Sequence, residues 1–314
     1  MRPSRTAPSC RSSSVWSASA ASTSRRAAPG SGGADPARGP PTLPRVSCEQ
    51  PVRPGGEPGL QVAVLVKYVP EPQGTPTLGE DLLLVREGVE GALDPGDEYP
   101  IEAALRLIEA HGGEVHLVSM GPEVAMSAIR RGLSMGAHSG TLVTDPVLRG
   151  ADALATARVL AAAVGRRAFD VLLAGAESTD GYTGTVPMAV AELLGIPSAT
   201  FARKVEVVDG TLRVERQTEA GYDVVECPLP ALATVTGSAD EPRYPTLKGI
   251  MSAKGKPVEQ LSLADLGVDA ADARPTQRVV SVADAPQKTA GEMIAATDGA
   301  AARVADLLAE AKVI

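Results

Sequence analysis

Two hydrophobic patterns alternate along most of this chain. A continuous apolar run of strand length, typical of a strand buried on both faces of a sheet, occurs at 62–66, and further strands are expected at 115–120, 141–143 and 170–174. Between them, apolar residues recur every three or four positions, the spacing of a helix, at about 97–112, 121–133, 151–164 and 184–194. Each strand–helix pair fits a right-handed crossover between parallel strands. The pattern predicts an α/β fold with a doubly wound, mostly parallel sheet, Rossmann-like and suited to adenine nucleotides.

After Thr200 the apolar residues alternate with polar ones, which predicts an added β-hairpin region. Residues 201–208 and 211–217 form two expected strands, and Asp209-Gly210 between them suits a type I′ turn. A third strand near 222–226 and a buried strand at 231–236 follow. We expect an α/β domain at 61–266 and a C-terminal helical arm at 267–314. One amphipathic helix ends the arm, and it either embraces a partner or packs on its own domain.

The segment that follows the buried strand has the composition of a docking element. Pro242 and Pro245 force an extended exit, after which Leu247, Ile250 and Met251 recur at helical spacing. Lysines surround these apolar residues, at 248, 254 and 256, which suits an acidic partner. The alternative is a helix that packs on its own sheet with its lysines in water.

Residues 1–60 differ in composition from the rest of the chain. They hold eight arginines, three acidic residues and ten prolines, with few large apolar side chains, so we expect a disordered leader. A misassigned start codon and an organellar transit peptide are both open explanations. The remaining residues carry 22 basic and 35 acidic side chains, an excess of acid that argues against nucleic acid as a partner.

Cysteine and histidine are too sparse for several kinds of chemistry. The three cysteines, Cys10, Cys48 and Cys227, form neither a disulfide framework nor a CxxC pair, and they predict no metal site. The three histidines, His111, His116 and His138, show no pattern of a base paired with a serine or cysteine nucleophile, so we expect no catalytic residue. No apolar run approaches the roughly 20 residues that cross a bilayer, so we expect no direct membrane insertion.

Three loops reach the carboxyl edge of the predicted sheet, where open parallel sheets bind ligands. Residues 175–185 are rich in glycines and hydroxyls immediately before a helix, and can offer N–H groups to a phosphate. Residues 94–97 and 119–122 form the other two loops. A capped connection built from ordinary turn residues is the alternative reading of 175–185.

These residues also match a known family. Residues 241–245 with Ile250-Met251 are the most specific part of the match. Further similar stretches are Val66-Lys67, 94–98, 135–137, 170–175, 200–202, 214–234 and 266–269. From about Val62 to the C-terminus the chain resembles the beta subunit of electron transfer flavoproteins, bacterial type, whereas the leader has no counterpart there.

The resemblance implies an electron carrier and not an enzyme with its own turnover. In this family beta pairs with an alpha subunit, the two share a redox-active FAD, and beta binds AMP. Carried over onto this sequence, the AMP site comprises Leu65, Asp94, Pro95, Gly96, Asp97, Leu117, Met120, Gly175, Asp180, Gly181, Tyr182, Thr183, Gly184, Thr185 and Val186. Partner docking falls on Leu247, which enters a pocket of the dehydrogenase, with Arg243, Ile250 and Met251 beside it.

The resemblance also implies a place in metabolism. Electrons come from acyl-CoA dehydrogenases and related dehydrogenases, as in fatty acid β-oxidation, and pass to a membrane quinone oxidoreductase. We expect the carrier in the cytoplasm.

Two other functions stay open. Residues 180–186 also resemble the loop of electron-bifurcating relatives that bind a second FAD here, but Ala176 stands where those relatives have a basic residue, which favours AMP. A stand-alone nucleotide sensor of the stress-protein type would explain the α/β pattern but not the hairpin region or the segment 240–256.

Overall fold

The computed structural model describes residues 59–71, 76–283 and 291–314 of the 314-residue chain. All but the last two residues of the expected leader, 1–60, therefore lie outside the described residues.

A nine-stranded sheet forms the centre of the fold, in the order β11-β5-β4-β1-β6-β10-β7-β8-β9. Its parallel strands are β1 (Leu60–Leu65), β4 (Gly113–Met120), β5 (Ser139–Val143), β6 (Val171–Gly175), β10 (Ala231–Val235) and β11 (Val258–Leu261). β1, the first described strand, lies in the middle of the sheet, and later strands are added on both sides of it. The predicted doubly wound α/β architecture is confirmed.

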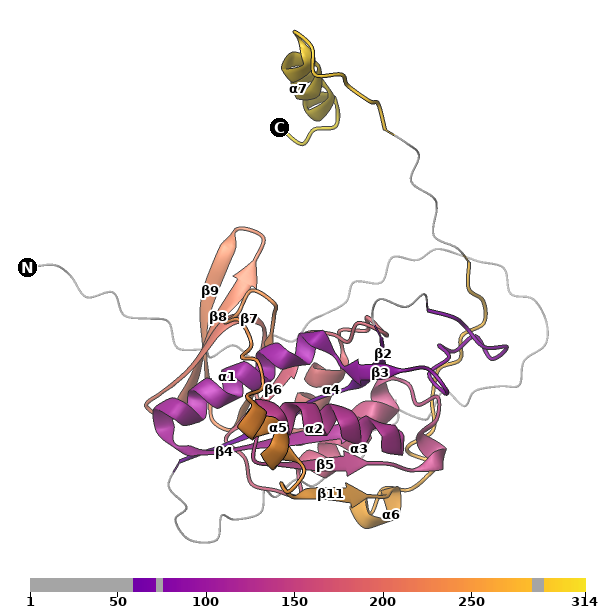
Figure 1. Cartoon of the computed structure of the whole chain (residues 1–314), viewed down its shortest axis with the longest axis vertical. Coiled ribbons are helices and arrows are strands. Elements are labelled where there is room, and N and C mark those ends of the chain that lie inside the picture. The colour runs from indigo at the N-terminus through magenta and orange to yellow at the C-terminus, as the bar shows by residue number, and fades with distance from the viewer. Residues whose placement is uncertain (1–58, 72–75, 284–290) are drawn as a thin grey trace, which may run out of the picture. The chain divides into compact units, whose positions relative to one another are not determined.

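Both faces of this sheet are covered by helices. Val62 and Val64 of β1 pack into one hydrophobic core with α1 (Pro95–His111) and α2 (Met126–Met135). Ala63 and Leu65 pack into a second core with α3 (Ala153–Val164) and α4 (Val186–Leu194). Figure 1 shows α1, α2 and the short helix α5 (Leu247–Ala253) side by side on one face. Burial on two faces is the reason that β6 and residues 62–65 of β1 are apolar at every position.

The hairpin region extends the sheet with antiparallel strands. β7 (Ser198–Val208) pairs parallel with β10 and antiparallel with β8 (Thr211–Thr218), which pairs antiparallel with β9 (Gly221–Pro228). Asp209 and Gly210 have φ values of 49° and 73°, both positive, as a type I′ turn requires. In Figure 1 these strands extend past the helix-covered part of the sheet.

Some elements differ from the sequence-based expectation. The first helix begins at Pro95 and not near Asp97, because Asp94 caps it by accepting a hydrogen bond from the N–H of Gly96. The predicted helix at 121–133 begins with the 3-10 turn η1 (Glu123–Ala125). A 3-10 turn η2 (Pro146–Leu148), a small sheet of β2 (Tyr68–Pro70) and β3 (Gly91–Leu93), and the helix α6 (Leu263–Leu266) were not predicted.

The start of the C-terminal arm remains attached to the domain. Asp152, the N-cap of α3, accepts hydrogen bonds from the N–H of Thr276, the Oγ1 of Thr276 and the N–H of Gln277 at 2.6, 2.8 and 3.1 Å. The terminal helix α7 (Ala300–Glu310) has no buried residue. Among the described residues, no helix combines the length and the apolar character that a membrane crossing requires.

Candidate functional site

The structure brings two of the predicted loops together at the carboxyl ends of β1 and β6. Asp94, fully buried, accepts hydrogen bonds at its Oδ2 from the N–H of Thr179 at 2.7 Å and from Thr179 Oγ1 at 3.1 Å. Its Oδ1 accepts from the N–H of Gly96 at 2.9 Å. One carboxylate therefore both caps α1 and fixes the loop 175–185 beside it.

Asp97 closes the same region from the first turn of α1. Its Oδ2 accepts a hydrogen bond from the N–H of Lys67 at 2.7 Å, and the N–H of Gly175 also donates to its carboxylate. Burial, followed by the charge of Asp94, raises the pKa of Asp97 well above its ordinary value, although both N–H donors oppose the shift. Gly175 leaves space for this carboxyl, since a Cβ there would lie 2.8 Å from Asp97 Oδ1.

Asp180 is held by two cations, neither of which was predicted as a site residue. Lys67 Nζ lies 2.6 Å from Asp180 Oδ1, while Arg86 donates to Oδ2 from Nη2 at 2.7 Å and from Nε at 2.9 Å. Burial would raise the pKa of Asp180, but the charge and hydrogen bonds of Lys67, and then those of Arg86, lower it below its ordinary value. Arg86 lies in an irregular segment between β2 and β3, where no sequence pattern marks it.

The rest of the loop turns sharply into α4. Tyr182 and Gly184 have φ values of 47° and 59°, in the left-handed region that favours glycine, so Tyr182 is a strained position. Thr185, the N-cap residue of α4, makes no side-chain capping bond. The N–H groups of Val186 and Met188 in the first turn of α4 therefore receive no cap from Thr185, while Pro187 between them has no N–H, and free donors of this kind favour an anionic group.

The other predicted cradle residues differ in position. Met120 is half-buried at the end of β4, next to β1, and Leu65 is buried at the end of β1, so both lie at the carboxyl edge. Leu117 lies three positions before that edge, in the core against α1 and α2. Ser119, fully buried on the α1 face of β4, has an Oγ that makes no hydrogen bond to the described residues. It lies in the predicted loop 119–122 and can bond a ligand there.

The docking segment packs on its own domain and also exposes its large apolar residues. Gly249 lies against the backbone of Ser134 in α2, where a Cβ would collide with the carbonyl oxygen, and Ala253 is buried. On the opposite side of α5, Leu247 is 76 % exposed, and Ile250 and Met251 are exposed as well. The helix therefore packs on its own domain through one set of side chains and leaves another set exposed, and docking by the exposed set stays a prediction.

Part of the positive charge near α5 is engaged within the chain. Arg243 donates to Glu102 of α1 from its N–H, Nε and Nη2 and to Glu109 from Nη1. Lys256 Nζ donates to the carbonyl oxygens of Leu133 and Ala137 at 2.9 and 2.6 Å, where it caps the end of α2. Lys248 and Lys254 are exposed, so the surface that a partner can meet is less basic than the sequence indicates.

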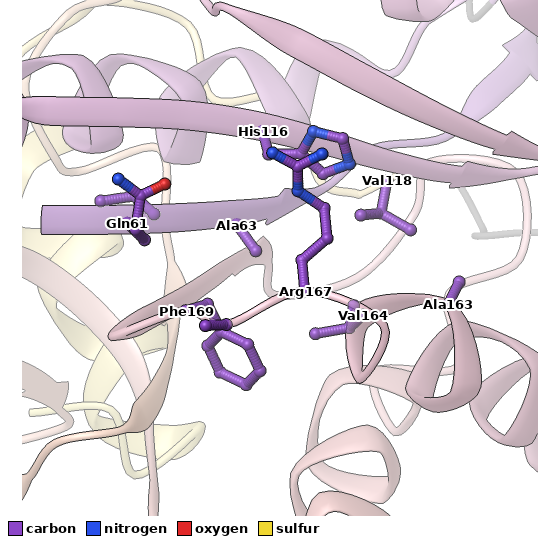
Figure 2. Close-up of a pocket in the computed structure, with 10 residues that line it drawn as sticks. Gln61, Ala63, His116, Val118, Ala163, Val164, Arg167 and Phe169 are labelled. Atoms are coloured by element: carbon purple, nitrogen blue, oxygen red, sulfur yellow. The ribbon is translucent and has the colours of Figure 1, made fainter. Parts of the chain in front are cut away.

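A small pocket lies away from this edge, beside the end of α3. Figure 2 shows its lining, in which the Arg167 side chain reaches towards the imidazole of His116. Both imidazole nitrogens of His116 are hydrogen-bonded, to Ser139 Oγ at 2.7 Å and Thr141 Oγ1 at 2.9 Å. Burial and then the charge of Arg167 lower its pKa to about 3, so the ring is neutral and structural. The described residues contain no cluster of side chains that could hold a metal ion.

Comparison with known proteins gives one consistent result. A family profile described as "Electron transfer flavoprotein domain" matches residues 81–266. The electron transfer flavoprotein subunit beta of Mycobacterium tuberculosis (strain ATCC 25618 / H37Rv) is 38% identical over 243 residues, which cover 74% of this chain and 91% of that protein.

Relatives in other bacteria agree. The subunit beta of Mycobacterium leprae is 36% identical over 263 residues, which cover 81% of this chain and 99% of that protein. That of Bacillus subtilis is 37% identical over 231 residues, which cover 73% and 90%. With this fold and this carboxyl-edge site, the chain belongs to the electron transfer flavoprotein family, among its beta subunits.

Proposed function

We propose that this chain, paired with an alpha subunit, carries electrons from acyl-CoA dehydrogenases and related dehydrogenases to a membrane quinone oxidoreductase. The observation that supports the docking step is the exposed apolar face of α5, formed by Leu247, Ile250 and Met251. A small apolar anchor suits contacts that hold briefly and then release. Arg243 supports docking by fixing the preceding loop, since its guanidinium already binds Glu102 and Glu109. The carrier works in the cytoplasm, and the reductase provides the contact with the membrane.

FAD, bound between the two subunits, supplies the redox chemistry, and this chain shapes one side of the complex. Large apolar side chains are exposed along β7–β9, at Phe201, Val208, Tyr222 and Val224. Such a surface is typical of one that a permanent subunit interface covers. The C-terminal arm, 267–314, completes the contact with the alpha subunit. In support, no residue of α7 is buried within this chain, so the apolar side of the helix is free to contact a partner.

AMP is the nucleotide proposed for the carboxyl-edge site. The uncapped start of α4 and the cations of Lys67 and Arg86 fit its phosphate. Hydroxyls of Thr183 and Thr185 fit its ribose, and the apolar Leu65 and Met120 suit the base.

Purification of the chain together with its alpha subunit tests this function. We expect a yellow heterodimer that releases one FAD and one AMP on denaturation, as identified by mass spectrometry. Two FAD per heterodimer would instead show the electron-bifurcating type. A colourless homodimer that binds ATP would replace the carrier by a nucleotide sensor.

A further inference from the structure

The carboxylate of Asp180 and its two cations differ in their access to solvent. The Asp180 side chain is 4 % exposed, whereas the side chains of Lys67 and Arg86 are 40 % and 45 % exposed. Each cation therefore presents one side to the buried carboxylate and another to solvent. Lys67 Nζ also lies 3.1 Å from Ser178 Oγ, so three residues of the site meet at this ammonium group.

The backbone next to Lys67 carries no side chain at position 181. Gly181 follows Asp180 directly, and a Cβ at this position would lie 3.8 Å from Lys67 Nζ and 3.2 Å from Ser178 Oγ. Five residues after Gly181, the uncapped N-terminus of α4 begins, where Val186 and Met188 carry N–H donors and Pro187 has none. The same cations can therefore reach either the internal carboxylate or an external anion.

We propose that Lys67 and Arg86 together bind the nucleotide phosphate and that Asp180 is an internal counterion, which competes with the phosphate for these two cations. This inference rests on the proposed nucleotide site and adds a device that limits how tightly the site holds its ligand.

The charges at the site indicate that Asp180 and the phosphate compete for the two cations and do not bind them independently. Lys67 and Arg86 together carry two positive charges, and Asp180 carries one negative charge, since its pKa is lowered. A phosphate monoester carries a charge of about −1.5 to −2 at pH 7, which is enough to neutralise both cations alone. With Asp180 in place the phosphate is under-compensated and meets a like charge. The carboxylate of Asp94 does not compete for Lys67 or Arg86, because its hydrogen bonds come from the N–H groups of Gly96 and Thr179 and from Thr179 Oγ1.

The direction of one substitution distinguishes this device from an ordinary contact. If Asp180 competes, Asp180→Asn frees the two cations and tightens AMP binding, by about tenfold for the removal of one nearby, partly screened charge. If Asp180 instead bonds the ligand directly, the same substitution weakens binding. Adenosine, which lacks the phosphate, should bind parent and variant equally in the first case.

The experiment titrates AMP and adenosine into the heterodimer with its alpha subunit, after bound nucleotide has been removed, by isothermal titration calorimetry. We expect Asp180→Asn to lower the Kd for AMP about tenfold and to change that for adenosine by less than twofold. Arg86→Gln and Lys67→Gln should each raise the Kd for AMP at least fivefold and leave adenosine unchanged. Glu206→Gln is the control, since Glu206 forms a similar ion pair with Lys204 at 2.7 Å on β7.

Two results separate the inference from the function beneath it. The counterion role of Asp180 is overturned if the parent binds AMP and Asp180→Asn weakens that binding or leaves it unchanged. It is also overturned if the lysine and arginine variants lose adenosine binding as much as AMP binding. Failure of the parent heterodimer to bind AMP at all overturns the proposed nucleotide site itself. Should Asp180→Asn not fold, Asp180→Ser gives the same test, because it also removes the negative charge; AMP binding that Asp180→Ser weakens or leaves unchanged likewise overturns the counterion.

Discussion

Glu102 anchors the segment before α5 to the middle of α1, and Glu102→Gln tests the anchor. Its carboxylate, 3 % exposed, accepts hydrogen bonds from the N–H, Nε and Nη2 of Arg243 at 3.2, 2.7 and 3.0 Å and from Nε of Arg106 at 3.0 Å. Burial would raise the pKa of Glu102, but the bonds from Arg243 and Arg106 lower it below its ordinary value. The anchored segment leads directly into the exposed helix.

The magnitude follows from the four hydrogen bonds. Glutamine keeps the shape of the side chain but retains one of two acceptor oxygens, so two of the bonds are lost. A bond to a charged group contributes about 1.5–3 kcal/mol, and about 1 kcal/mol is a suitable value here because both arginines are partly in water. The expected loss in the free energy of unfolding is about 2 kcal/mol, which lowers Tm by about 4–8 °C in a domain of this size.

Thermal unfolding of the heterodimer, followed by circular dichroism, measures this loss. Because the pKa of Glu102 is lowered in the folded chain, its contribution is present above the ordinary value of 4.5 and is lost as the pH falls through the folded pKa. The difference in Tm between parent and variant should therefore be full at pH 7 and shrink as the pH falls below about 4.5. The released loop should also raise the KM for a dehydrogenase at unchanged kcat.

Glu109→Gln is the matched control. Glu109 is exposed and accepts one hydrogen bond, from Arg243 Nη1 at 2.6 Å, so its loss should cost less than about 1 kcal/mol. A Tm for Glu102→Gln within about 1 °C of the parent would refute the reasoning, as would an equal fall for both variants.

Two further predictions concern docking and the carboxyl-edge site. Leu247→Ala should slow electron transfer from a dehydrogenase about tenfold at limiting carrier concentration and leave the flavin content unchanged. The reason is that the leucine side chain, exposed in this chain, would be buried in the partner, and alanine loses most of that burial. Equal rates for parent and variant, or an equal effect of the control Val147→Ala at an exposed site in η2, would contradict this prediction. Asp97→Asn should gain Tm relative to the parent as the pH rises from 5 to 9. Because the pKa of Asp97 is raised in the folded chain, its contribution to stability is complete below about pH 4 and is lost as the pH rises through the folded pKa. A difference in Tm between parent and variant that does not change with pH would contradict a raised pKa for this buried carboxyl.

Local patterns were enough to predict most of the fold. The continuous run at 62–66 predicted a strand with helices on both faces, and β1 has that environment because alternate residues enter two cores. Asp209-Gly210 predicted its turn, since few other residues accept positive φ at both positions. β11 was not predicted because it is an edge strand in which Leu261 is the one fully buried side chain.

The pairings within the site could not be predicted, because they join residues far apart in the chain. Lys67 and Asp180 are 113 positions apart, and Arg86 and Asp180 are 94 apart. No local spacing indicates that two cations converge on one carboxylate. For the same reason the sequence placed Arg243 and Lys256 on a basic docking surface, whereas the fold assigns them to Glu102 and to the end of α2.

The path of the chain between β10 and β11 has a consequence for how such carriers diverge. These two strands are separated in the sheet by β6, β1, β4 and β5, and the residues that join them, 236–257, carry α5 across the outside of the helical layer. Both ends of this stretch are fixed in the central sheet, so it can be exchanged between relatives as one cassette without any change in strand order. Under the proposed function, the docking helix can thus change between relatives separately from the proposed nucleotide site at the N-terminal end of α1.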